Sequence, residues 1–182
     1  MINNLRPGVW YGIMPLVGLV ISLAGPQAQV SAAHYENAMA VLNGIQTIYV
    51  SVKPIENPGV VGTDSDEGQI KASVEQQLRK AGISVLPQEE YDRYKMTLKY
   101  PLANLEIGIT AHKLEGMNDA VVVVSVRLMQ VVFLARKAIV QVNAPTWESR
   151  EIGVGNDPNF TEKALRKNVN FFIEDYFEAN PR

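Results

Sequence analysis

Few residues in this sequence could do chemistry, and the two histidines come first. His34 lies near the N-terminus, and His112 lies in a segment of alternating apolar and polar residues. A zinc site needs three or four converging ligands, but the chain has no cysteine and no HxH or HExxH pattern to supply them. We therefore predict no metal site, and we interpret His112 as a solvated strand residue.

Motifs for nucleophilic catalysis and phosphate binding are also missing. No serine stands in a G-x-S-x-G elbow. The glycine-containing segments 59–64 and 153–158 precede predicted helices, where free backbone N–H groups can hold an anion. Each lacks the Lys-Ser/Thr pair of a phosphate loop and contains an aspartate that would repel phosphate. Both are interpreted as connecting loops, and the sequence predicts no catalytic residue and no cofactor.

Pairs of neighbouring carboxylates could in principle do acid–base chemistry. The pairs are Glu89 with Glu90, Glu148 with Glu151, and Glu174 with Asp175. Their expected positions on helices or at loop edges favour ordinary solvated charges.

An excess of apolar residues between positions 120 and 147 is more informative. Trp147 either completes the core or serves as an aromatic anchor for a partner, and Val131 and Phe133 belong to the same apolar excess. Apolar side chains beyond those a core needs mark binding surfaces when they are exposed. The candidate binding residues are therefore Trp147, Val131 and Phe133.

Apolar stripes at helical spacing predict two helices. The stripe of the first is Ile70, Val74, Leu78 and Ala81, and that of the second is Leu165, Val169, Phe172, Ile173, Tyr176 and Phe177. Capping-box pairs precede both, namely Asp64 with Glu67 and Asn159 with Glu162. Gly82 is expected to end the first helix, and Asn180 with Pro181 the second. Residues 88–93 are expected to form one helical turn.

Alternating residues predict strands at 45–52, 83–86, 105–112 and 120–126. The last two are expected to form a hairpin in which Ile109 faces Val124. This register also places Glu106 opposite Arg127, a charge match that was not used to choose it.

The apolar alternation changes phase near residues 128–130. A strand with a period of two cannot keep both apolar sets on one face, so we predict a bulge or sharp bend there, or else apolar residues on both faces. The chain is then expected to turn at Arg136 and Lys137 into a strand over 139–147. In that strand Val142 would face Val131.

The order β-α-β-β-β-β-α predicts an α+β fold, with a four- to five-stranded mixed or antiparallel sheet and two helices on one face. The segments 78–86, 144–147 and 172–181 resemble those of a widespread group of small exported bacterial proteins of unassigned function. The arrangement is also similar to α+β domains of envelope assembly proteins, such as the TolB N-terminal domain and the curli secretion lipoprotein. The resemblance implies a location in the bacterial envelope, and it identifies no catalytic residue in this chain. The chain departs from the secretion lipoproteins because it has no cysteine to carry a lipid.

Residues 1–33 resemble a cleavable export signal, because Arg6 precedes an apolar stretch over 9–24 and small residues follow at 31–33. The alternative is a retained membrane anchor, but the stretch is shorter than a bilayer span and contains Pro15. Residues 34–182 are then expected to form one domain without a membrane span, in the periplasm or outside the cell.

The net charge of −2 gives no reason to expect nucleic acid or an anionic membrane as a partner. Because the apolar excess in residues 120–147 contrasts with the absence of catalytic motifs, we expect a non-enzymatic interaction or assembly-accessory domain that binds an envelope protein or itself through the sheet. The alternative is a ligand-binding protein or enzyme with a pocket between helices and sheet near Tyr49, His112 or Trp147.

Overall fold

The computed structural model describes residues 39–57, 66–97, 103–116, 120–155, 157 and 159–181. Its main elements are β1 Thr47–Val52, α3 Glu67–Ala81, β2 Ser84–Val85, α4 Gln88–Thr97, β3 Ala103–Lys113, β4 Ala120–Leu134, β5 Lys137–Gly155 and α5 Phe160–Ala179. The predicted α+β class is confirmed. The predicted leader at 1–33, with His34 and the glycine segment 59–64, lies outside the described residues.

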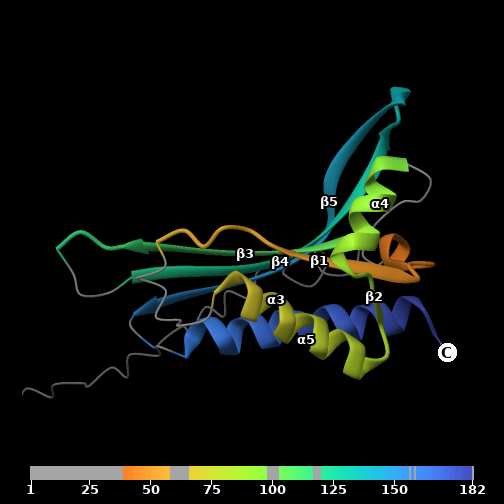
Figure 1. The fold of residues 1–182 in the computed structure, drawn as a ribbon. Coiled ribbons are helices and arrows are strands. Elements are labelled where there is room, and N and C mark those ends of the chain that lie inside the picture. Colours follow the sequence, from red (N-terminus) through yellow and green to blue (C-terminus); the bar gives the residue numbers. More distant parts are fainter. Residues whose placement is uncertain are drawn as a thin grey trace, which may run out of the picture.

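The strands form one mixed sheet in the order β2-β1-β3-β4-β5 (Figure 1). β1 runs parallel to both of its neighbours, whereas β3, β4 and β5 are antiparallel. The predicted hairpin register is confirmed, because Ile109 faces Val124 and Glu106 faces Arg127. The alternation of apolar residues was therefore sufficient to fix the pairing of β3 with β4.

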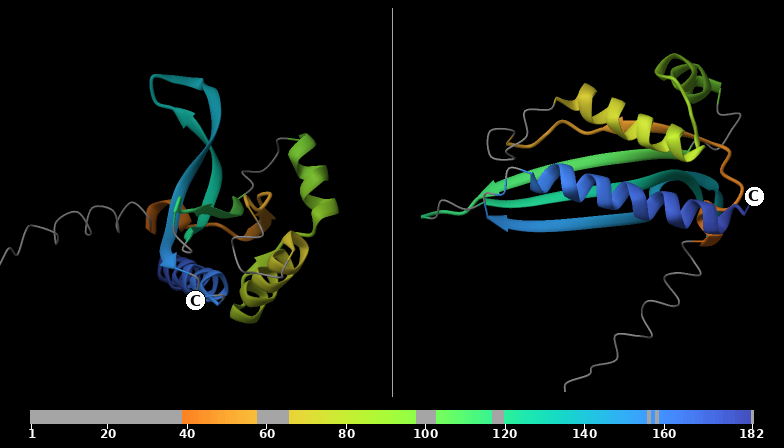
Figure 2. Two further views of the ribbon diagram at one scale, coloured as in Figure 1. Left: turned by 90° about the vertical axis from the view of Figure 1, so that its left-hand side faces the viewer. Right: turned by 90° about the horizontal axis from the view of Figure 1, so that it is seen from below.

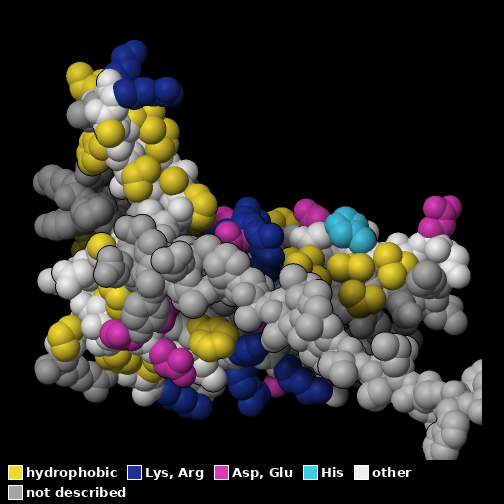
Figure 3. Space-filling model, turned by 180° about the vertical axis from the view of Figure 1, so that it is seen from behind, with side chains coloured by type: hydrophobic (Ala, Val, Ile, Leu, Met, Phe, Trp, Pro, Cys, Tyr) yellow, Lys and Arg dark blue, Asp and Glu magenta, His cyan; other side chains and the backbone are white. Residues whose placement is uncertain are grey.

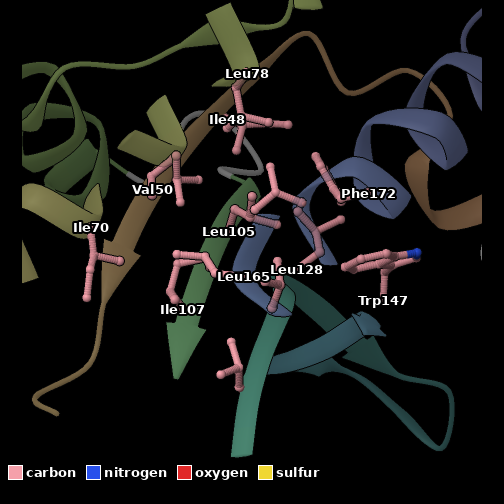
Figure 4. Close-up of a cluster of buried hydrophobic side chains, with 14 of the residues drawn as sticks. Ile48, Val50, Ile70, Leu78, Leu105, Ile107, Leu128, Trp147, Leu165 and Phe172 are labelled. Atoms are coloured by element: carbon pink, nitrogen blue, oxygen red, sulfur yellow. The ribbon is translucent and has the colours of Figure 1, made fainter. Parts of the chain in front are cut away.

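Helices α3 and α5 cover one face of the sheet, as predicted (Figure 2). The core lies between these helices and the sheet. Figure 4 shows its central side chains pointing toward one another from the helical layer and from the sheet. Asn168 of α5 is fully buried there, but its amide group is paired: its Nδ2 donates to the Val124 carbonyl oxygen at 3.1 Å, and its Oδ1 accepts from the Ser149 hydroxyl at 2.8 Å. These bonds fix α5 across β4 and β5.

The first covering helix ends as predicted but begins differently. Its N-cap is Asp66, whose carboxylate accepts the Gln69 N–H at 2.7 Å; the predicted cap, Asp64, lies outside the described residues. Gly82 ends the helix with a left-handed φ of 89°.

The capping box predicted for α5 is wrong. The side chain of Asn159 makes no capping hydrogen bond, and Glu162 instead pairs with Arg166 at 2.7 Å. The Asp157 carboxylate accepts the N–H of Asn159 at 2.9 Å, so a side chain just before the helix stabilises the turn that leads into it. The predicted end at Asn180 is confirmed.

The two ends of the described chain are joined at one end of the molecule. The Asn180 side chain donates to the Leu42 carbonyl oxygen at 3.0 Å and accepts the Gly44 N–H at 2.8 Å. The Tyr176 hydroxyl donates to the Ile45 carbonyl oxygen at 2.7 Å. The last helix therefore holds the segment that leads into β1.

Helix α4 is longer than the single turn predicted for residues 88–93, and it lies on the other side of the sheet from α5 (Figures 1 and 2). The Tyr91 ring stacks on Tyr49 of β1 with ring centroids 3.7 Å apart. Lys71 of α3 donates to the Tyr49 hydroxyl at 3.1 Å and to the Gln88 side-chain oxygen at 3.0 Å. These contacts hold α4 against β1.

Strands β4 and β5 leave the plane of the sheet at a bulge. Leu128 faces Trp147 but Met129 faces Pro145, so Thr146 is an extra residue on β5. The predicted bulge is confirmed, although it lies on β5 and not on β4. The alternation of side chains along β4 is uninterrupted at this point, so the apolar residues before and after Leu128 lie on opposite faces of the strand. The bulge and the apolar residues on both faces, which were predicted as alternatives, therefore occur together.

Beyond the bulge, residues 129–144 form a hairpin that we call the arm. It bends away from α3 and α5, toward the face that those helices leave uncovered, here called the outer face (Figures 1 and 2). The predicted pairing in the arm is wrong by one residue, because Val131 faces Asn143 and not Val142. A second irregularity between Phe133 and Leu134 adds residues near the tip and shifts the register.

Strand β5 was predicted to end at Trp147 but continues to Gly155, so the interpretation of 153–155 as a loop is wrong. Gly153 faces Val122 inside the sheet, and a Cβ at this position would lie 2.7 Å from the Phe160 ring. The glycine is there because the first residue of α5 packs on the strand backbone.

Candidate functional site

The arm exposes large apolar side chains. Val131 is 39% exposed, Phe133 is 60% exposed, and Ile139 near the tip is 92% exposed. Side chains alternate between the two faces of a strand. The even-numbered residues 122–128 of β4 are buried against the helices, so the odd-numbered Val131 and Phe133 lie on the outer side. Figure 3 shows this apolar surface on the projecting arm, with cations at its tip.

The arm also has an unusual charge distribution. Residues 129–144 contain no Asp or Glu, whereas Arg136 and Lys137 stand at the turn and are exposed. The tip is therefore a pair of cations beside apolar residues. The chain as a whole has a net charge of −2, so composition alone could not locate this feature.

Side chains at the bulge tie the base of the arm to the sheet. The Thr146 hydroxyl lies 3.2 Å from the Leu128 carbonyl oxygen and 2.5 Å from the Gln130 side-chain oxygen, and it can donate its one proton to either. Both acceptors lie on β4, so either hydrogen bond links the bulged residue of β5 to β4. Pro145 is compatible with β5 because β5 is the edge strand.

Trp147, the third candidate binding residue, lies below the bulge in the core and is 7% exposed. Its ring packs edge to face on the Phe172 ring, with the ring centroids 5.1 Å apart, and its Nε1 donates to the Asp175 carboxylate at 2.8 Å. Figure 4 shows the Trp147 ring directed toward α5. The structure therefore brings Val131 and Phe133 together on the arm and places Trp147 apart from them.

Charged residues cross the outer face between the arm and the opposite end of the sheet. Lys53 pairs with Glu106 at 3.0 Å, and Glu148 pairs with Arg127 at 2.9 Å and Arg150 at 2.6 Å. Partial burial raises the pKa of Glu148, but hydrogen bonds from the two arginines outweigh it and hold the pKa below its ordinary value. We call these five residues the ionic belt.

A second apolar surface lies beyond the ionic belt. Its members are paired across β4 and β5: Val121 faces Val154, and Val123 faces Ile152. Ile152 is 62% exposed and Val154 is 71% exposed. These four residues, here called the far-end patch, share the outer face with the ionic belt. Sequence reasoning missed Ile152 and Val154 because the last strand was predicted to end at Trp147, whereas β5 continues to Gly155. Val121 and Val123 lie within the predicted strand 120–126, but they were not identified as candidate binding residues.

The other chemical candidates do not assemble into a site. His112 is exposed on β3, as expected. Glu151 pairs with Lys167 at 2.6 Å, and Asp175 accepts the hydrogen bond from Trp147. The loop-edge position expected for Glu148 and Glu151 is wrong, because both lie within β5. Among the described residues, no group of three or more His, Asp or Glu could hold a metal ion.

Two hollows lie on the helical side of the molecule. One, of about 560 Å³, runs along the exposed side of α5 between Asn159 and Glu174; the other lies between α3 and α5 near Gln77 and Asn170. Neither lies between the helices and the sheet. The residues predicted to line a ligand pocket are also separated, since Tyr49 stacks on Tyr91, Trp147 is in the core and His112 is on the outer face.

No family model matches this chain, and no curated protein matches it. Similar solved structures include the PelC dodecamer from Paraburkholderia phytofirmans, with 12% identity over 74% of this chain and 86% of that chain and a TM-score of 0.34. A hypothetical protein from Chlamydia trachomatis has 8% identity over 72% and 98% of the two chains and a TM-score of 0.37. A lipoprotein from Neisseria meningitidis has 18% identity over 74% and 99%, with a TM-score of 0.36. These scores assign no function, and the envelope location stays a prediction.

The described helices α3, α4 and α5 are 15, 10 and 20 residues long. None of them has both the length and the apolar character needed to cross a bilayer.

Proposed function

We propose that this chain is an exported, non-enzymatic docking protein whose binding element is the arm. The observation that supports this proposal is the exposure of Val131, Phe133 and Ile139 on a hairpin that projects from the domain (Figures 1 and 3). Leaving such side chains in water costs free energy, and a partner that covers them recovers it. Exposed apolar clusters of this kind are typical of protein interfaces.

The structure supports a rigid binding element. The bulge is tied by Thr146, and the sheet below it is backed by Trp147 and Phe172 in the core. A hairpin held in one orientation loses little conformational entropy when a partner binds. Val131 and Phe133 are therefore the residues that we propose contact the partner, and Trp147 acts indirectly by fixing the base.

Photo-crosslinking in the producing cell tests this function. A benzophenone amino acid placed at Phe133 or Ile139 should give a discrete protein adduct, because both positions lie on the proposed interface. The matched control is Phe171 on α5, which is also apolar and is 42% exposed. Absence of an adduct at both arm positions, or the same adducts at all three positions, would contradict the proposal.

Export is a separate part of the proposal and rests on residues 1–33. N-terminal sequencing of the protein recovered from cells should begin at Ala33 or His34. A first residue upstream of these, with the protein retained in the membrane fraction, would instead show an anchored form.

A further inference from the structure

We propose that the partner of the arm is a second copy of this chain, held face to face by a two-fold axis, with each arm packed on the far-end patch of the other copy. This inference rests on the proposed function and names its partner. It starts from the observation that one outer face carries two apolar surfaces at opposite ends.

Both surfaces belong to the same pair of strands. The far-end patch lies at the start of β4 and the end of β5, and the arm lies where β4 ends and β5 begins. Along β4 the two are centred near Val122 and Val132, ten residues apart, which corresponds to roughly 33 Å in an extended strand. A copy that runs in the opposite direction therefore places its far end beside the first copy's arm.

The bend of the arm gives this arrangement its direction. The arm rises on the outer side, so the sheet and the arm form an open corner above β4 and β5 (Figures 1 and 2). The far end of a facing copy fits into this corner, where Val131 and Phe133 can contact Ile152 and Val154. Apolar area is then covered on both sides of the contact.

Charge complementarity selects a second copy over an unrelated apolar surface. Arg136 and Lys137 at the arm tip have no acidic residue near them within residues 129–144. Glu56, beside Thr110 of β3, and Glu115, in the following turn, are exposed at the far end of the sheet, and neither forms an ion pair within the described residues. The cations of one copy can therefore meet these carboxylates in the other.

Two-fold symmetry uses all four surfaces at once. Each copy gives one arm and receives one, so both exposed apolar surfaces of each chain are covered and the assembly closes at two copies. The ionic belts face each other near the axis, where their internal pairs and solvent screen the like charges. A head-to-tail arrangement would instead leave surfaces free for further copies.

The absence of cysteine from the chain allows a direct test. The purified protein, expressed from its full sequence, carries Ile139→Cys in one preparation and Val154→Cys in another, and the two are mixed and treated with a short bismaleimide. We expect a covalent dimer in the mixture and little in either preparation alone. The matched control replaces Val154→Cys by Phe171→Cys on the helical side. Thermal melts confirm that each variant folds, since all three positions are exposed.

The doubly substituted chain, Ile139→Cys with Val154→Cys, then distinguishes the symmetry. Closure at a dimer supports the two-fold arrangement, and a ladder of trimers and larger species overturns it. The unmodified chain should show twice its monomer mass by light scattering. Crosslinking no greater than in the Phe171 control overturns the inference. If the photo-crosslink at Phe133 still joins another protein, the proposed function stands without it; if that adduct is also missing, both fall.

Discussion

The indole N–H of Trp147 donates to the carboxylate of Asp175 at 2.8 Å, joining β5 to α5 directly below the base of the arm. This hydrogen bond explains why an aromatic residue next to an exposed hairpin is buried. It also means that changes to Asp175 act on the stability of the sheet where the arm begins.

Replacing Asp175→Ala should lower the free energy of unfolding by about 1–2 kcal/mol, because the largely buried indole N–H loses its acceptor. Urea unfolding followed by circular dichroism measures the change. The neighbouring Glu174→Ala is the control and should stay within about 0.5 kcal/mol of the parent, since Glu174 is exposed. Equal effects of the two variants would show that the hydrogen bond adds nothing to stability.

Replacing Gly153→Ala should destabilise the fold by about 1–3 kcal/mol, because the new methyl group would lie 2.7 Å from the Phe160 ring. The double variant Gly153→Ala with Phe160→Ala tests the cause, since removal of the ring leaves the methyl group with space. We expect the double variant to be more stable than the sum of the two single changes predicts. Strict additivity would contradict a steric origin.

Glu148 should make stability depend on pH in the acidic range. Its folded-state pKa is lowered, so the unfolded chain takes up the proton first and stability falls as pH decreases from the ordinary carboxyl pKa through the folded value. Glu148→Gln should therefore lower the melting temperature near pH 7, and the difference from the parent should shrink between about pH 5 and about pH 3. Melting curves across this range measure it; a constant difference would be inconsistent with the ion pairs to Arg127 and Arg150.

Deleting Thr146 should straighten the arm, because Trp147 and Pro145 flank the bulged residue and their partners Leu128 and Met129 are consecutive on β4. The apolar side chains stay on the arm, but the corner that receives a second copy is lost. We expect a folded monomer by circular dichroism and light scattering. Thr146→Val, which keeps the residue count, should remain a dimer; a dimer from the deletion variant would show that the bend is not needed.

Charge reversal at the arm tip, Arg136→Glu with Lys137→Glu, should weaken self-association about tenfold, corresponding to about 1.4 kcal/mol. Mixing this variant with a chain that carries Glu56→Lys and Glu115→Lys should restore part of the affinity in the mixed dimer. Sedimentation velocity at low salt measures both effects. If the mixture does not recover affinity, the tip cations do not contact Glu56 and Glu115 of the other copy.

Local patterns in the sequence were sufficient for part of this fold and not for the rest. The alternation of β3 and β4 fixed their register, and the phase change near Leu128 predicted the bulge. The strand that carries the extra residue could not be known, because Thr146 has no signal of its own. The length of helix α4 was underestimated because the residues that it contacts, Tyr49 and Lys71, are distant from it in sequence. Gly153 was misinterpreted because a glycine before a helix suggests a loop. In the structure a glycine is needed within the strand because the Phe160 ring packs against it.

The candidate site was predicted only in outline. The apolar excess at Val131 and Phe133 was visible, and the structure shows these residues exposed, but their binding role stays a prediction. The predicted turn at Arg136 and Lys137 did not indicate how exposed the nearby side chain of Ile139 would be. Trp147 could not be assigned to the core or to the surface until the Asp175 contact was known, because that contact joins residues 28 positions apart.

The last helix has a consequence for synthesis. Residues 160–180 cover β4 and β5, supply Phe172 to the core and hold Leu42 through Asn180, across 138 positions of sequence. A nascent chain that has emerged only as far as β5 lacks this cover, so its sheet cannot bury its apolar face before α5 emerges. The order of synthesis therefore delays burial of this face until α5 is available, and the preceding strands stay without their cover until then.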